Sequence, residues 1–183
     1  MLNIIALIIK TIWLLIPAYT PNNFAVVFGG GMPIDFRKKF IDGKRILGDG
    51  KTIRGFVFGV MGGILCGMIQ YKIEPIFNLN LFSSLSIFDA FCLIFALSFG
   101  SLSGDVFGSF IKRRAGIERG GVFPVFDQLT FLAVSLLFAY LISPHFSSLF
   151  TREVIVTGLI VTPVLHLIAN IIAFKLGLKN VPW

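Results

Sequence analysis

The stretch that decides the fold runs from Gly104 to Thr130 and reads GDVFGSFIKRRAGIERGGVFPVFDQLT. It begins inside an apolar segment, passes through a cluster of cations and enters the next apolar segment at Asp127. At about 100° per residue, a helix here places a line of polar side chains on one narrow face: Ser98, Ser101, Asp105, Ser109 and Lys112. Because charged residues within membrane segments are rare and usually functional, this line predicts a polar site.

Two carboxylates and three cations meet in this stretch. Asp105 and Asp127 lie on either side of Lys112, Arg113 and Arg114. Carboxylate oxygens suit a divalent metal ion, and clustered cations suit phosphate groups. The sequence therefore predicts a site for a metal ion together with phosphates. The alternative is a hairpin loop that only sets membrane orientation, with Asp105 as a hydrogen-bonded polar residue.

The whole chain has the composition of an integral membrane protein. Of its 183 residues, 56% are hydrophobic, whereas soluble domains are usually about 45–50% apolar. The net charge of +7 comes from cations in short loops between apolar runs, a pattern typical of topology signals and phosphate contacts and not of a nucleic-acid-binding face. Cys66 and Cys92 fall in apolar segments and indicate neither a disulfide nor a metal site. We expect one transmembrane catalytic domain over residues 1–183 that binds no nucleic acid.

Five apolar segments are long enough to cross about 30 Å of hydrocarbon as helices. They cover residues 3–28, 53–71, 87–111, 123–142 and 153–175, which predicts an all-α bundle of five transmembrane helices. The first segment lacks a basic region before it and a cleavage site after it, so we expect a retained helix. Pro17 and Pro21 predict a kink or break in that helix. Asn22 and Asn23 then either belong to the kinked helix end or line a substrate cavity.

Positive charge is concentrated on one side of the predicted bundle. Loop 29–54 contains 7 Lys and Arg residues and loop 112–122 contains 4, whereas the opposite side has only Lys72 and Arg152. The positive-inside rule then places the N-terminus outside and the C-terminus with both basic loops in the cytoplasm. We therefore expect a multi-pass protein of the cell membrane with a cytoplasmic site.

Glycines mark two further features. Loop 29–54 is rich in glycine, which favours a backbone that approaches a ligand closely and offers N–H groups to anions, although a solvated basic loop is the alternative. The segment 53–71 repeats glycine every four residues, which predicts close helix packing. The third segment has the same spacing at Gly100, Gly104 and Gly108, so its glycines are the expected partners.

The central stretch resembles a known signature. Gly104-Asp105, Ser109, Lys112-Arg113, Pro124 and Asp127 follow the order found in bacterial CDP-diacylglycerol synthases. The chain departs from that pattern at Glu118-Arg119, where the family has Lys-Asp, at Gln128, where it has Arg, and in lacking the His-Gly-Gly segment. The shorter form of this signature, as it stands in this chain, is closely similar to that of the archaeal CDP-archaeol synthase family. That resemblance extends over nearly the whole chain, through residues 17–19, 22–23, 29–31, 33–35, 42–45, 48–52, 54–55 and 104–129.

The resemblance implies an enzyme with five membrane helices and two cytoplasmic loops that uses CTP and Mg²⁺. The implied reaction joins CTP to a membrane-embedded isoprenoid ether lipid phosphate, 2,3-bis-O-geranylgeranylglycerol 1-phosphate, and gives CDP-archaeol and pyrophosphate. Asp105 and Asp127 would hold the metal, with Lys112 and Arg113 as further catalytic residues. Nucleotide and phosphate binding is expected at Lys44, Arg45, Asp49, Gly50, Lys51, Thr52, Arg54, Ser109, Arg114 and Gln128. The substrate cavity is expected at Asn22, Asn23 and Asp35.

Two other classes of membrane protein remain as alternatives. A small anion transporter would also place polar residues within the membrane, but here they gather at one side and no inverted repeat is evident. A lipid-binding scaffold would use the basic loops for anionic headgroups but would not explain the two carboxylates beside the cations. Release of pyrophosphate from CTP separates the enzyme from both.

Overall fold

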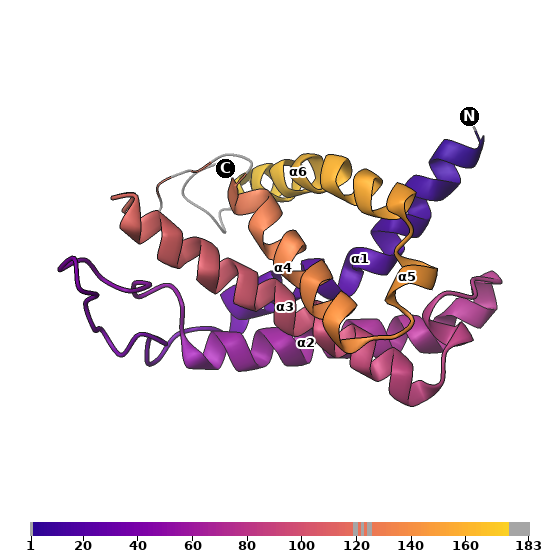
Figure 1. The fold of residues 1–183 in the computed structure, drawn as a ribbon, viewed down its shortest axis with the longest axis horizontal. Coiled ribbons are helices and arrows are strands. Elements are labelled where there is room, and N and C mark those ends of the chain that lie inside the picture. The colour runs from indigo at the N-terminus through magenta and orange to yellow at the C-terminus, as the bar shows by residue number, and fades with distance from the viewer. Residues whose placement is uncertain (1, 119–120, 122, 124–125, 176–183) are drawn as a thin grey trace.

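The computed structural model describes residues 2–118, 121, 123 and 126–175, and its regular elements over these residues are helices. Figure 1 shows the long helices α1 (Leu2–Phe28), α2 (Ile53–Ile73), α3 (Ile87–Arg114), α4 (Phe126–Ile142) and α6 (Arg152–Lys175). Short helical turns join them: η1 (Glu74–Phe77), η2 (Phe82–Ser84) and α5 (Phe146–Leu149). The all-helical prediction is confirmed for the described residues.

Three stretches of the described chain are long and apolar enough to cross a membrane. They are Asn3–Phe28, Ile53–Phe77 and Ile87–Arg114, and α4 is a shorter apolar helix of 17 residues. Their outward faces carry large exposed apolar side chains, for example Val26, Leu65 and Phe88. Such faces are stable against lipid, so the fold is that of a membrane protein.

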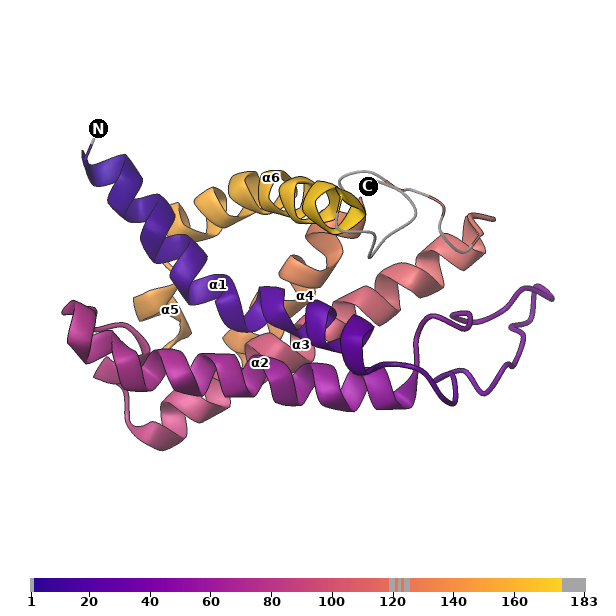
Figure 2. The same cartoon turned by 180° about the vertical axis from the view of Figure 1, so that it is seen from behind.

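Helix α3 lies at the centre of the bundle. It packs against α1, α2 and α4, while α6 packs against α1 and α4. Figure 1 shows α4 on the near side of α3, and Figure 2, seen from behind, shows α1 on the other side. The shared core is made of fully buried side chains, including Leu14 and Leu15 of α1, Leu93 and Leu97 of α3 and Leu132 of α4. Polar groups in the middle of α3, such as Ser98 and Ser101, are therefore enclosed by protein.

The two prolines bend α1 without ending it (Figure 2). A proline lacks the N–H that would bond the carbonyl four residues earlier, so Pro17 frees the Trp13 carbonyl and Pro21 frees the Pro17 carbonyl. Gln70 Nε2 donates to the Trp13 oxygen at 2.8 Å, and Ser98 Oγ donates to the Pro17 oxygen at 3.0 Å. Side chains of α2 and α3 thus replace the lost helix bonds, which a buried carbonyl requires.

Glycines set close helix contacts, and the α2 glycines meet the third helix as predicted, but the two glycine series do not face each other. A Cβ added to Gly63 of α2 would lie 2.5 Å from Ser98 Oγ and 2.7 Å from Pro21 Cγ, so this face of α2 meets α1 and α3. A Cβ added to Gly104 of α3 would lie 2.7 Å from the Phe131 Cα, which belongs to α4. Six residues separate Ser98 from Gly104, which is about 240° around a helix. Helix α3 therefore turns Gly104 toward α4 and offers Ser98 to α2.

Candidate functional site

The polar line on α3 divides into a structural part and a charged part. Ser98 and Ser101 are fully buried and donate to the α1 carbonyls of Pro17 and Ala18, at 3.0 and 2.6 Å. Further along, Ser109 Oγ donates to the carbonyl of Asp105 within the same helix, at 2.9 Å. The serines thus satisfy backbone groups, and the candidate site begins at Asp105.

Asp105 forms an ion pair with Lys51, which lies at the end of the loop between α1 and α2. The next residue, Thr52, caps α2 by accepting a hydrogen bond from the Gly55 amide at 3.1 Å. This cap fixes where the helix starts and hence where Lys51 projects. The Asp105 side chain is 33% exposed, so the pair stays accessible to a ligand. A predicted phosphate-binding residue and a predicted metal ligand therefore lie together.

Asp127, at the start of α4, forms a second ion pair, with Lys112 of α3. Lysine Nζ lies 2.8 Å from Asp127 Oδ1, and the aspartate is 30% exposed. The second carboxylate oxygen accepts a hydrogen bond from the Phe123 amide at 3.3 Å, which holds the start of α4. Seven residues separate Asp105 from Lys112, or about 10 Å along α3. The two predicted metal ligands are thus held at the same end of α3, each beside its own lysine.

A divalent ion at this end of α3 would take its ligands partly from a carboxylate and partly from a substrate. No group of three or more His, Cys, Asp or Glu side chains suited to a metal occurs within residues 2–118, 121, 123 and 126–175. Mg²⁺ is usually held by one or two carboxylates together with substrate phosphates, and a lysine can turn from a carboxylate to a phosphate. Asp105 and Asp127 are the residues that would hold the ion in this arrangement.

Asp35 organises the loop between α1 and α2. Its buried carboxylate accepts two hydrogen bonds from Arg45, at 3.0 and 3.1 Å, and one from each amide of Leu47, Gly48 and Arg37, at 3.0 Å. Burial raises the pKa of Asp35, but the bonds from Arg45 and these amides outweigh it and hold the pKa well below its usual range. The predicted place for Asp35 is the substrate cavity, whereas the structure encloses its carboxylate within the loop. The role that these contacts support is structural.

Arg113 and Arg114 fasten this loop to the end of α3. Arg113 Nε donates to the Leu47 carbonyl at 3.0 Å, and Arg114 Nη1 lies 2.6 Å from Asp42 Oδ1. Gly48 has a φ of +101°, and a Cβ there would lie 3.4 Å from Arg113 Nε, so glycine lets the guanidinium close on the loop. Both arginines thus position the loop, and their predicted contact with phosphates stays a prediction.

The remaining predicted residues surround these contacts. Lys44 Nζ donates to the Arg114 carbonyl at 3.3 Å, and Asp49 pairs with Arg45 at 2.9 Å. Arg54 is exposed, with its guanidinium 5.8 Å from the centre of the Phe58 ring. Gly50 is exposed and Gln128 is half-buried near the start of α4, while Asn22 and Asn23 lie in the last two turns of α1. Arg119 and Pro124 lie outside the described residues.

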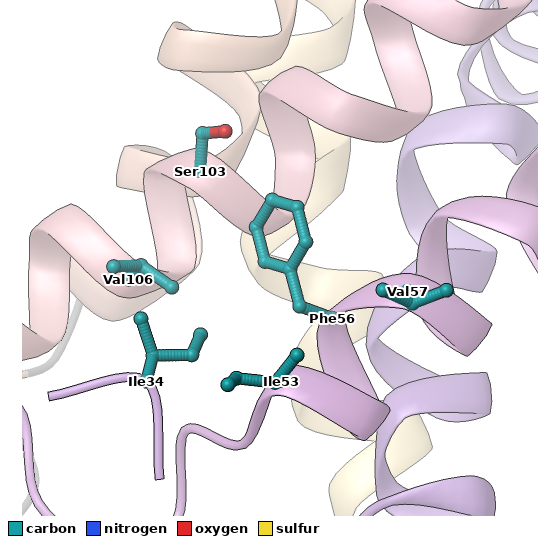
Figure 3. Close-up of a pocket in the computed structure, with 6 residues that line it drawn as sticks. All are labelled: Ile34, Ile53, Phe56, Val57, Ser103 and Val106. Atoms are coloured by element: carbon teal, nitrogen blue, oxygen red, sulfur yellow. The ribbon is translucent and has the colours of Figure 1, made fainter. Parts of the chain in front are cut away.

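Sequence reasoning missed an apolar pocket between the loop, α2 and α3 (Figure 3). It has a volume of about 330 Å³ and draws side chains from the loop, α2 and α3. The residues that line it are Ile34, Ile53, Phe56, Val57, Ser103 and Val106. In the sequence Ile34 is an ordinary loop residue and the other five lie in apolar helical segments. Only the nearness of Ile53 to Lys51 and of Val106 to Asp105 could have drawn attention to them.

Comparisons with known proteins all indicate the same family. The family model described as "CarS-like: CDP-archaeol synthase" matches residues 4–183. A CDP-archaeol synthase of Archaeoglobus fulgidus is 59% identical over 177 residues, which are 97% of this chain and 98% of the relative. Another, from Methanococcoides burtonii, is 48% identical over 175 residues, which are 92% of this chain and 100% of the relative.

A solved structure has the same fold. It is described as an intramembrane enzyme for archaeal membrane lipids biosynthesis. It superposes with a TM-score of 0.74 at 35% sequence identity, over 90% of this chain and 94% of the other. These relatives share the length, the helical fold and the sequence of this chain, which therefore belongs to the CDP-archaeol synthase family.

Proposed function

We propose that this chain transfers the cytidylyl group of CTP to 2,3-bis-O-geranylgeranylglycerol 1-phosphate and releases pyrophosphate. Membership in the family makes it a CTP-dependent cytidylyltransferase that forms CDP-archaeol from a lipid phosphate in a membrane. The geometric observation that supports the assignment is the pair of partly exposed carboxylate–lysine contacts at one end of α3, Asp105 with Lys51 and Asp127 with Lys112. Such a site suits two phosphorylated substrates.

The chemistry requires little covalent help from the protein. An oxygen of the lipid phosphate attacks the α-phosphorus of CTP, the bond to the β-phosphate breaks, and pyrophosphate leaves with the electron pair. Positioning and charge neutralisation supply most of the rate of such a step. Lys51 and Lys112 would turn from their carboxylates to the phosphate oxygens, and the freed Asp105 and Asp127 would hold Mg²⁺, which supplies further neutralising charge.

The loop between α1 and α2 would position the nucleotide. Its predicted binding residues are Lys44, Arg45, Asp49, Gly50, Lys51, Thr52 and Arg54, joined by Ser109, Arg114 and Gln128 from α3 and α4. The Asp35 network and the two arginines hold this loop against α3. A loop anchored in this way keeps its glycine-rich backbone next to Asp105, where N–H groups can meet anionic oxygens.

The finer topology belongs to the same proposal. We place α4 and α6 across the bilayer with the three longer spans, giving five transmembrane helices in one catalytic unit of the cell membrane. The basic loops, the active site and the C-terminus face the cytoplasm, where CTP is present, and the N-terminus faces outside. The concentration of Lys and Arg in loops 29–54 and 112–122 supports this orientation.

Pyrophosphate release tests the proposed function. Purified protein in detergent or liposomes is given CTP, Mg²⁺ and the geranylgeranyl ether lipid phosphate, and the lipid product is identified by mass spectrometry. The expected result is equal release of pyrophosphate and CDP-lipid, both dependent on the lipid. Anion flux or lipid binding by folded protein without any pyrophosphate would instead support the transporter or the scaffold.

A further inference from the structure

We infer that the apolar pocket between the loop, α2 and α3 is the subsite for the first part of one hydrocarbon chain of the lipid phosphate. This inference rests on the proposed function, because it assigns a place to the substrate of that reaction. The pocket is named here the chain groove and consists of Ile34, Ile53, Phe56, Val57, Ser103 and Val106.

The lining of the chain groove matches a hydrocarbon and not a nucleotide. Five of the six residues are apolar, and the Ser103 hydroxyl is the only polar side-chain group among them. Figure 3 shows Ile34 of the loop, Ile53 and Phe56 of α2 and Val106 of α3 gathered around one space. A volume of about 330 Å³ lies within the usual range for small-molecule sites. Ribose and triphosphate would leave polar groups unpaired there.

The position of the chain groove matches a molecule that carries a phosphate at one end. Val106 directly follows Asp105, and Ile53 comes two residues after Lys51. Lys51 and Asp105 form an ion pair, so the loop and α3 each carry a charged residue close in sequence to a residue of the groove. A phosphate bound at Lys51 would therefore have the adjoining apolar chain beside Ile53 and Val106. Groups suited to both chemical halves of a lipid phosphate thus lie near one another in the chain.

One side of the chain groove opens toward the bilayer. Ile53 and Val57 are 42% and 48% exposed, and the exposed side chains of α2 between Arg54 and Lys72 are all apolar. A chain could enter sideways between α2 and α3 without leaving the hydrocarbon, and the phosphate would stay at the interface. This direction of entry is the one an insoluble substrate needs, because moving the chain through water would cost about 0.8 kcal/mol per CH₂.

Filling the chain groove tests the inference. Val57→Trp adds bulk at the groove, and Met61→Trp is a matched control one turn further along the same helix at a similarly exposed position outside it. We expect Val57→Trp to raise the KM for the geranylgeranyl lipid phosphate by about tenfold, the scale of a steric change in an apolar site, while the KM for CTP stays unchanged. Met61→Trp should leave both constants unchanged.

A second variant and a stability measurement keep the result interpretable. Ile53→Trp fills the groove from another direction and should give the same separation of the two KM values. Thermal unfolding, with and without CTP, confirms that each variant is folded and binds nucleotide. The inference is overturned if folded Val57→Trp and Ile53→Trp keep the wild-type KM for lipid, as they would if the groove held a bilayer lipid, or if Met61→Trp raises that KM equally. Failure of the proposed function looks different, because then the wild-type protein itself makes no CDP-lipid.

Discussion

Lys112 Nζ lies 2.8 Å from Asp127 Oδ1, so one ion pair joins the last turns of α3 to the first turn of α4. Residues 115–125 link these two helices in the chain, and the ion pair joins them directly. Together with the Lys51–Asp105 pair, this contact brings the loop, α3 and α4 to one place. An ion pair with both partners partly exposed adds little to stability. We propose that the two pairs hold their charges ready for a ligand.

The first prediction concerns the two carboxylates. Asp105→Asn and Asp127→Asn keep the size of the side chain but remove its charge, so each should lower turnover by at least about a hundredfold, or ~2.7 kcal/mol in the barrier. Pyrophosphate release at saturating Mg²⁺ measures the effect, and unchanged thermal unfolding shows that the fold is intact. Near wild-type rates for both variants would mean that the metal lies elsewhere.

The sequence predicts the charged end of α3 well because its signals are local. Asp105, Lys112 and Asp127 stand out as charges in apolar surroundings, and helical spacing places the first two on one face. The structure adds the partner of Asp105, which is Lys51 from a loop more than 50 residues away in the sequence. That pairing depends on how the loop folds back, and spacing along the chain carries no information on it.

The same limit explains contacts that the sequence does not predict. Asp35 and Arg113 look like ligand-binding charges, and in the structure they form hydrogen bonds with Arg45 and with the Leu47 carbonyl. Their predicted contacts with ligands stay predictions. The glycine spacing correctly predicts close packing, yet α3 turns Gly104 toward α4 and not toward α2. Glycine at every fourth position shows that one face of a helix can pack closely. It does not show which neighbouring helix packs there.

Membrane orientation gives the second prediction. In a background without Cys66 and Cys92, a cysteine at the exposed Lys38 should resist a membrane-impermeant thiol reagent in intact cells and react after the cells are opened. A cysteine at the exposed Ser147, within the short helix α5 that follows α4, should react in intact cells. Labelling is read by mass shift on a gel. The reverse pattern would place the site outside and contradict the proposed topology.

The third prediction concerns a close-packed glycine of α2. Gly63→Leu would put side-chain atoms where an added Cβ already lies 2.5 Å from Ser98 Oγ, so α1, α2 and α3 would have to separate. We expect a loss of about 1–3 kcal/mol, as for overpacked cores, seen as a lower thermal unfolding temperature in detergent. Leu65→Ala, at an exposed position of the same helix, is the control and should change it little. Equal stability of both variants would show that this face of α2 is not packed.

The fourth prediction tests the loop that Asp35 organises. Asp35→Asn removes the charge that Arg45 and three amides share, so the loop should open more often. Because cleavage follows the population of the open form, limited proteolysis at the loop lysines and arginines should be at least about tenfold faster. Asp49→Asn is a matched control, since Asp49 pairs with the same Arg45 but is 55% exposed. That variant should be cleaved at nearly the wild-type rate.

Acid adds an independent test of the same network. The hydrogen bonds hold the pKa of Asp35 below its usual range, so the folded state favours the ionised carboxylate more strongly than the unfolded chain does. The resulting stabilisation is fully present above the unfolded pKa, about 4, and is lost as the pH falls through the folded value. The difference in unfolding temperature between wild type and Asp35→Asn should therefore stay constant from neutral pH down to about pH 5 and shrink below about pH 4. A gap that instead widens on acidification would show that the Asp35 carboxylate is not the charge that holds the loop closed.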